Sequence, residues 1–393
     1  MQFRSNPKTG ESLSALGYGC MRFTKRGGVI DQEKAEREML LALENGVNYF
    51  DTAYIYPGSE ACLGKFIQHY QCRDRLYIAT KLPQYRVNKI ADAEKYFQEE
   101  LDRLQTDHVD YYLMHMLNDA SSWQRLCALG IREWIADKKK TGAIRHIGFS
   151  FHGGTRQFKE LVDDYDWEFC QIQFNYMDEY SQAGIEGLRY AHEKGLPVVI
   201  MEPLRGGKLA GGFSKETQHI FDTAEPRRSP VDWALRWIWD HPEVTVVLSG
   251  MNDETQVTEN CRIASESLPN TLSPDELAVY GRLLAAMRAQ TRVGCTGCGY
   301  CQPCPKGVDI PTCFSIYNSS YVDGYINGLR EYIMCTTLRK VRSNAGLCVK
   351  CGKCEQHCPQ HIDIRNQLDG VKKRFESPLY KIAAKGLPLI MKY

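Results

Sequence analysis

Short stretches rich in β-favouring residues alternate with amphipathic stretches from residue 16 to about residue 264. The eight β-favouring stretches are, in chain order, LGYGCM, YFDTA, YIATKLP, VDYYLMH, RHIGFSF, FCQIQFN, PVVIMEPL and VTVVLSG. Between them lie segments such as DQEKAEREMLLALENG, whose apolar residues recur at helical spacing. Eight strands interleaved with helices over roughly 250 residues predict an α/β fold of the (β/α)8 TIM-barrel type.

A doubly wound sheet is the main alternative, and it is disfavoured because no G-x-G-x-x-G motif follows any of these strands. The opening MQFRSNPKTGESLSA predicts a hairpin that turns at Lys8-Thr9-Gly10 and closes the barrel floor. Residues 206–230 are glycine-rich and polar, and we expect a long loop there that covers the site. A helix is expected over residues 272–288. Two domains follow, a barrel over residues 1–290 and a smaller domain over residues 291–393.

The last quarter of the chain carries two tight cysteine runs, C-x2-C-x2-C-x2-C-P and C-x2-C-x2-C-x3-C-P. Three thiolates spaced two residues apart let one loop wrap a cube of iron and sulfide, and a further cysteine before proline completes the ligand set. We therefore predict two [4Fe-4S] clusters. The predicted ligands are Cys295, Cys298, Cys301, Cys304, Cys348, Cys351, Cys354 and Cys358.

Disulfides and zinc are the alternative uses of these thiols. Disulfides are typical of short secreted chains, whereas this chain is long, begins MQFRSNPKTG without an apolar signal segment, and scatters its other cysteines. Zinc usually takes two separated cysteine pairs and not a triplet followed by Cys-Pro. Clusters and a reduced, cytoplasmic setting are favoured.

A ferredoxin-like arrangement implies crossed ligation, in which the last cysteine of each run serves the other cluster. Cys358 would then join the triplet of the first run, and Cys304 the triplet of the second. A triplet of Cys298, Cys301 and Cys304 is the alternative, although Pro305 favours Cys304 as the crossing ligand. Apolar and aromatic residues between the two runs recur at helical spacing, so we expect a mainly helical, ferredoxin-like domain.

Composition and charge exclude some classes of partner. With 43% hydrophobic residues, the chain of 393 residues can form a large core and is not disordered. Its 49 basic and 48 acidic residues give no overall reason to expect nucleic acid or a membrane surface as a partner. No apolar run approaches the ~20 residues needed to span a bilayer.

Four polar residues stand at or just after the ends of successive predicted strands, where TIM barrels hold their chemistry. Asp51 ends the second strand and is followed by Tyr56; Lys81 ends the third and His115 the fourth. Each alone has a structural explanation, as a helix cap, a cleft tyrosine or a hydrogen-bonded histidine. Together they suit proton delivery to a carbonyl oxygen during hydride transfer. The Lys81 ammonium would lower the pKa of Tyr56, Asp51 would hold Lys81, and His115 would orient the carbonyl.

The motifs FDTAYIY, ATK, YLMH, GFS, QIQFN and SGMNDETQVTEN resemble those of the aldo/keto reductase family over roughly residues 1–290. The resemblance implies a (β/α)8 barrel that binds NADPH or NADH without a Rossmann motif. It also implies that Asp51, Tyr56, Lys81 and His115 form the catalytic tetrad. The whole chain resembles the branch of the family with a C-terminal ferredoxin-type domain carrying two [4Fe-4S] clusters.

The same resemblance implies a set of cofactor contacts. Ser150 and Gln171 would hold the carboxamide of the nicotinamide, and Glu259 and Asn260 would contact the adenine. Leu204 belongs to the same expected set.

This chain departs from the family at several cofactor positions. Met201 replaces the aromatic residue that commonly stacks on the nicotinamide, and a thioether packs there more loosely. Gly250 and Gln256 stand where cations usually bind the 2′-phosphate, so a preference for NADP over NAD is unsupported. Arg205 and Lys208 are alternative phosphate contacts, although a solvated loop explains both.

These observations leave two functions. The first is nicotinamide-dependent reduction of a small aldehyde or ketone to an alcohol, with Tyr56 as the general acid. The second is electron transfer to a partner, with the barrel acting as a binding or docking module. Hydride carries two electrons and clusters pass one, so a direct link normally needs a flavin, and no flavin motif is visible. A third interpretation makes the clusters structural, and it is compatible with the first function.

Overall fold

The computed structural model describes residues 1–117, 119–289, 292–295, 297, 299, 301–322, 324–337, 342–358, 361–378 and 380. The chain divides into two compact units, Met1–Ala210 with Arg228–Ser273 and Gly211–Arg227 with Pro274–Tyr393. This division falls before the helix at residue 274, and the sequence-based boundary near residue 290 stays a prediction. No helix in the described ranges has the length and apolar character to cross a membrane.

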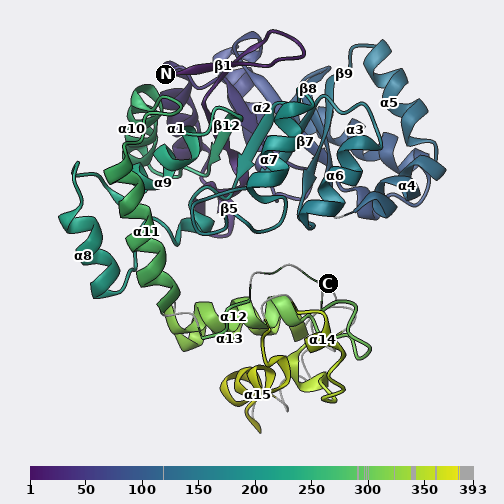
Figure 1. Ribbon diagram of the computed structural model, residues 1–393. Coiled ribbons are helices and arrows are strands. Elements are labelled where there is room, and N and C mark those ends of the chain that lie inside the picture. Colours follow the sequence, from purple (N-terminus) through teal and green to yellow (C-terminus); the bar gives the residue numbers. More distant parts are fainter. Residues whose placement is uncertain are drawn as a thin grey trace. The chain divides into compact units, whose positions relative to one another are not determined.

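The first unit is a closed barrel of eight parallel strands (Figure 1). The strands are β3 (Leu16–Gly19), β6 (Tyr49–Asp51), β7 (Tyr77–Leu82), β8 (Val109–Leu117), β9 (Ile144–Phe151), β10 (Phe169–Gln173), β11 (Val198–Met201) and β12 (Val244–Ser249). Each pairs in parallel with its neighbour, and pairing of β12 with β3 helps to close the barrel. All eight predicted strands, and the predicted barrel, are confirmed.

Helices follow the barrel strands. They are α1 (Gln32–Glu44), α2 (Ser59–Tyr70), α3 (Ile90–Leu104), α4 (Ala120–Ala128), α5 (Ile131–Lys140), α6 (Thr155–Asp163), α7 (Gly184–Glu193), α9 (Pro230–Trp239) and α10 (Glu254–Glu266). Side chains of the polar residues before several of them accept hydrogen bonds from the first turn, as Asp31 and Ser229 do. A two-stranded sheet of β4 (Lys25–Arg26) and β5 (Val29–Ile30) precedes α1.

An N-terminal hairpin packs against the interior of the barrel. Its strands, β1 (Phe3–Ser5) and β2 (Ser12–Ser14), pair antiparallel, and Gly10 in the turn has a φ of 75°. Leu13 is fully buried in one cluster with inward-facing barrel residues such as Tyr111 and Phe169. The hairpin predicted from the sequence is confirmed, and it covers the end of the barrel interior that these residues line.

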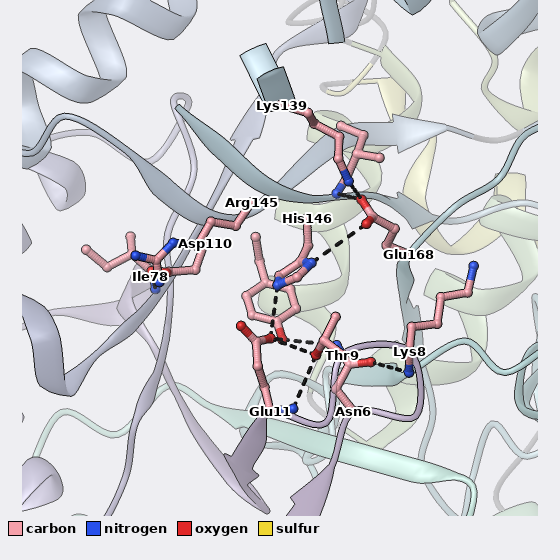
Figure 2. A network of polar contacts seen from close by, with 12 residues as sticks. Asn6, Lys8, Thr9, Glu11, Ile78, Asp110, Lys139, Arg145, His146 and Glu168 are labelled. Atoms are coloured by element: carbon pink, nitrogen blue, oxygen red, sulfur yellow. Dashed lines mark hydrogen bonds and ion pairs between the residues drawn. The ribbon is translucent and has the colours of Figure 1, made fainter. Parts of the chain in front are cut away.

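Polar contacts fasten this hairpin to the barrel (Figure 2). The Tyr111 hydroxyl donates to Glu11 Oε2 at 2.6 Å, and His146 Nε2 lies 3.0 Å from the same oxygen. On its other side His146 Nδ1 lies 3.8 Å from Glu168, which also pairs with Lys139. We call Glu11, Tyr111, Lys139, His146 and Glu168 the floor network.

The second unit is helical in its described residues. It contains α8 (Lys215–Thr223), α11 (Pro274–Ala289), α12 (Ile310–Val322), α13 (Tyr325–Tyr332), a π-helical turn (Ile333–Thr337), α14 (Lys353–Gln356) and α15 (Ile364–Phe375). Phe314, Tyr332, Leu368 and Phe375 are buried in its core. The prediction of a mainly helical domain is confirmed.

The prediction of a long loop over residues 206–230 is wrong in part, because α8 lies within them. Ser214 accepts a hydrogen bond from the backbone N–H of Thr217, so a capped helix starts directly after the glycines. In the division into units, residues 211–227 belong with α11 and not with the barrel.

Candidate active site and cluster site

A buried ion pair joins the carboxyl ends of two neighbouring strands. Lys81 Nζ on β7 donates to Asp51 Oδ1 on β6 at 2.5 Å and to the Thr52 carbonyl at 2.7 Å. The side chains are only 1% and 5% exposed. Burial disfavours the Lys81 ammonium, but Asp51 outweighs that cost and raises the pKa of Lys81. A positive charge is therefore held at the barrel mouth.

Tyr56 lies half-buried in the loop between β6 and α2. Lys81 Nζ is 5.3 Å from the centroid of its ring, and the His115 ring meets it edge-on at 6.1 Å between centroids. Burial raises the pKa of Tyr56, and Lys81 opposes that rise without reversing it. Lys81 thus acts on this pKa in the predicted direction, but the burial of the phenol, which the sequence does not reveal, leaves the pKa raised. Tyr56 is protonated at neutral pH and can donate.

His115 on β8 is 5% exposed. Burial, reinforced by the positive charge of Lys81, lowers the pKa of His115 to about 3. The imidazole is therefore neutral, and its Nδ1 has no hydrogen-bond partner in the described ranges. Since buried polar atoms are nearly always paired, this nitrogen is available to a group that is not part of the chain.

The two predicted carboxamide contacts lie beside the tetrad. Gln171 on β10 donates from Nε2 to Asp51 Oδ2 at 3.1 Å. Ser150 is its partner on β9, and its hydroxyl accepts a hydrogen bond from the Met116 backbone at 2.8 Å. Five adjacent strands, β6 to β10, and the loop after β6 thus gather the tetrad, Ser150 and Gln171.

The other predicted cofactor residues belong to the segments at and after β11 and β12. They are Met201, Leu204, Gly250, Gln256, Glu259 and Asn260. Asn260 donates to Ser249 at the end of β12, and Glu259 accepts from Ser229, which caps α9. No bound molecule tests their roles, so these stay predictions. Arg205 pairs with Asp178 at 3.0 Å, and this ion pair competes with a contact between Arg205 and a cofactor phosphate.

Two aromatic residues, Phe151 at the end of β9 and Trp123 on α4, belong to the core. Phe151 is fully buried and packs on Phe158 of α6, because successive residues of a strand face opposite sides and Ser150 faces inward. Trp123 is also fully buried, against Tyr165 and Trp167.

In the second unit, one cavity brings together thiols from both cysteine runs. Cys304, Cys348, Cys351 and Cys354 line it with apolar side chains that include Val308 and Leu368. This is the set expected for one cluster under crossed ligation, and the placement of Cys304 disfavours the alternative triplet. In the described ranges, no group of three or more His, Cys, Asp or Glu side chains is placed to hold a single metal ion. An iron-sulfur cube differs from a single ion because its four ligands bind at separate corners.

The two cysteine loops share one local conformation. In each, the backbone N–H two residues after the first cysteine donates to its sulfur: Gly297 to Cys295 at 3.5 Å and Lys350 to Cys348 at 3.4 Å. These two donors, and also Gly299 and Gly352, have φ between 59° and 76°. Such N–H···S contacts are typical of cluster-binding loops and tune the potential.

The first cysteine set is only partly described. Cys295, Cys301 and Cys358 are partly buried against the helical core, whereas Cys298 lies outside the described residues. Its grouping with Cys358 stays a prediction.

The aldo/keto reductase family model matches residues 15–273. The chain belongs to the aldo/keto reductase family. A 4Fe-4S dicluster domain model matches residues 294–362 of this family member, in agreement with the cysteine runs. The predicted family, with its C-terminal cluster domain, is confirmed.

Among curated aldo/keto reductase relatives, the uncharacterized oxidoreductase YrpG of Bacillus subtilis is 27% identical over 309 residues, covering 68% of this chain and 92% of its own length. L-galactose dehydrogenase of Arabidopsis thaliana is 26% identical and covers 68% of this chain and 89% of its own. The holo form of aldo-keto reductase AKR11C1 from Bacillus halodurans is 25% identical with a TM-score of 0.58, covering 72% of this chain and 96% of its own. A Klebsiella pneumoniae aldo-keto reductase in complex with NADPH has the same TM-score and coverage at 23% identity, which supports the fold alone.

One cation near the predicted cofactor residues of this aldo/keto reductase was not predicted from the sequence. Arg22, on the short helix Cys20–Arg22 after β3, lies against Gly250, which directly follows β12, and Gly206, in the short helix Arg205–Gly207 after β11. A Cβ at Gly250 would stand 3.1 Å from Arg22 Cδ, and one at Gly206 would stand 3.3 Å from its guanidinium. Only the folded chain brings these three segments together. The two glycines leave the space that Arg22 fills.

Proposed function

We propose that this protein reduces an aldehyde or ketone to an alcohol, with NADPH or NADH as the hydride donor and Tyr56 as the general acid. The observation that carries the proposal is the arrangement of Lys81 between Asp51 and Tyr56, with His115 edge-on to the same phenol. A bound nicotinamide supplies hydride to the carbonyl carbon.

Tyr56 gives its proton to the carbonyl oxygen as the hydride arrives, and the phenolate left behind faces the Lys81 ammonium. That ammonium stabilises the phenolate more than the neutral phenol, so it lowers the barrier to the transfer. Asp51 fixes the ammonium through a 2.5 Å contact and takes no part in the proton transfer.

His115 orients the carbonyl. Because its pKa is about 3, it acts as a neutral hydrogen-bond donor and not as an acid. At least one ring nitrogen of His115, Nδ1, has no hydrogen-bond partner within the described chain. Which ring nitrogen faces the substrate depends on the tautomer.

We infer that Arg22 supplies a cation to the cofactor phosphates. By family resemblance Gly250 stands at the 2′-phosphate position, and the Arg22 side chain covers Gly250 with its guanidinium beside Gly206. An exposed guanidinium at that point replaces the lysine or arginine that the family usually has there.

We also propose two [4Fe-4S] clusters with crossed ligation, supported by the joint cavity of Cys304 and the second cysteine run. Electron transfer through these clusters is the second candidate function. It remains separate from carbonyl reduction, because no group that converts hydride into single electrons is indicated.

The test of carbonyl reduction follows cofactor oxidation with a panel of small aldehydes and ketones. Wild type is compared with Tyr56→Phe and with Tyr85→Phe, whose side chain is half exposed and outside the tetrad. We expect Tyr56→Phe to lower kcat by about 10²–10⁴-fold, as for a lost general acid, and Tyr85→Phe to match wild type. Unchanged turnover by Tyr56→Phe on every substrate that wild type reduces would show that the acid is misassigned.

A further inference from the structure

The charge of this chain is segregated along its length. Residues 291–393 contain 15 Lys and Arg against 7 Asp and Glu, whereas residues 1–290 contain 34 against 41. The net charge of +1 for the whole chain hides this difference. A strongly basic cluster domain favours negatively charged partners, and it attracts them over a distance at low salt.

Several of these cations surround the cavity of the second cysteine run. Lys306 and Arg365 line the cavity itself, and Lys350 and Lys353 are the immediate neighbours of Cys351 and Cys354 in sequence. Val349, which also lines the cavity, is 58% exposed although it is apolar. We call Lys306, Val349, Lys350, Lys353 and Arg365 the basic face.

The basic face is only partly neutralised. Lys350 pairs with Asp369 at 2.5 Å and Arg365 with Glu355 at 2.7 Å. Lys306 and Lys353 are exposed and have no acidic partner within the described ranges. An unneutralised cation on a surface attracts an acidic group on another molecule and determines how the rate of encounter depends on salt.

We propose that the basic face docks a small acidic one-electron carrier protein, and that one electron passes between this carrier and the cluster held by Cys304, Cys348, Cys351 and Cys354. The proposal rests on the cluster assignment made under Proposed function. The step forms and breaks no bond and moves no proton: the reduced carrier loses one electron and the oxidised cluster gains it.

The composition of the face favours a protein over a nucleic acid. An exposed apolar side chain next to a cluster thiol, with charges around it, matches the apolar centre and charged rim of a small transient interface. A phosphate backbone would be expected to select unpaired cations in a row, whereas two of these four cations already pair with acidic residues.

Binding to the full, cluster-loaded chain tests the proposal. The probe is an acidic plant-type [2Fe-2S] ferredoxin, titrated calorimetrically at low and high salt. A basic cytochrome c serves as the probe of opposite charge, and a DNA oligonucleotide as the nucleic-acid probe. The variant is Lys306→Glu/Lys353→Glu, and the matched control is Arg330→Glu, an exposed cation on α13 that lines neither described cavity of this unit.

We expect the ferredoxin to bind wild type and Arg330→Glu alike, more weakly as salt is added. The double charge reversal should weaken binding by about tenfold or more. Unchanged binding in the double variant, equal binding of cytochrome c, or equal binding of an oligonucleotide would overturn the proposal. The visible cluster absorption of each sample separates the two assignments: protein that takes up no second cluster contradicts the ligand set, whereas loaded protein that binds no ferredoxin contradicts the basic face.

Discussion

Tyr56 and His115 have pKa values displaced in opposite directions at the barrel mouth. Burial is the main cause for both, since it disfavours a phenolate and an imidazolium alike. Neither residue therefore changes its charge near neutral pH. At neutral pH, Tyr56 therefore keeps its proton and His115 is uncharged.

The pH profile of kcat/KM for carbonyl reduction follows from these directions. An acid must be protonated to donate, so activity should persist until the pH exceeds the raised pKa of Tyr56. His115, with a pKa of about 3, should contribute no step near its ordinary value of 6.5. We expect a flat profile from about pH 5 to about pH 9. A step near pH 6.5 that disappears in His115→Gln would contradict the neutral histidine.

Arg22 is the residue on which the choice between NADPH and NADH depends. Loss of a charged hydrogen bond costs about 1.5–3 kcal/mol, so Arg22→Ala should weaken NADPH binding by about 10- to 100-fold. NADH, which lacks the 2′-phosphate, should bind almost as in wild type, and Arg22→Lys should restore part of the NADPH affinity. Fluorescence titration with both cofactors measures this. Equal Kd values for NADPH in wild type and Arg22→Ala would place the phosphate elsewhere.

At the scale of elements, the floor network ties the N-terminal hairpin to β8, β9 and the start of β10. Burial disfavours the charge on His146, but the contacts with Glu11 and Glu168 outweigh it and raise the pKa of His146 to about 9. Burial likewise disfavours the Glu168 carboxylate, yet His146 and Lys139 lower its pKa to about 2. His146 and Glu168 are therefore both charged at neutral pH.

His146 should make barrel stability fall at alkaline pH. Its stabilising contribution is complete below about pH 6.5, its unfolded value, and is lost as the pH rises through about 9. The pKa shift of His146 corresponds to up to about 3 kcal/mol of unfolding free energy. Each kcal/mol changes the melting temperature by about 2–4 °C. Melting of wild type, His146→Gln and the surface control His219→Gln at pH 6 and pH 10 measures it. An alkaline loss in His146→Gln as large as in wild type would contradict this role.

A second prediction at the scale of elements concerns the cysteine loops. Cys304→Ala should lose the cluster of the second run and lower the iron content from about eight to about four per chain. Cys313→Ala, which removes a buried thiol of the helical core outside both runs, should keep all of it. Iron and acid-labile sulfide assays on anaerobically purified protein measure both variants. Full iron content in Cys304→Ala would contradict crossed ligation.

The sequence predicted the elements whose signals are local. Stretches rich in β-favouring residues and the Lys8-Thr9-Gly10 turn predicted the eight barrel strands and the hairpin, and cysteine spacing predicted the cluster loops. Burial and contacts between distant segments were not predictable in this way. The pKa of Tyr56 depends on burial, and Arg22 meets Gly250 and Gly206 only after folding.

At the scale of the whole molecule, two kinds of redox chemistry share one chain. The barrel is suited to hydride, which carries two electrons, and the cysteine loops are suited to clusters that pass one electron at a time. The segregation of charge follows the same division, with an excess of basic over acidic residues in the part that carries the two cysteine runs. Binding of a nicotinamide by the barrel is the step on which carbonyl reduction depends.

The most direct measurement is therefore an anaerobic titration of the cluster-loaded full chain with NADPH and NADH, followed by cofactor fluorescence and visible cluster absorption together. We predict saturable binding of at least one cofactor to wild type and to Tyr56→Phe with similar Kd, and no bleaching of the clusters. Failure of wild type to bind either cofactor would contradict the reductase and leave the barrel as a docking module.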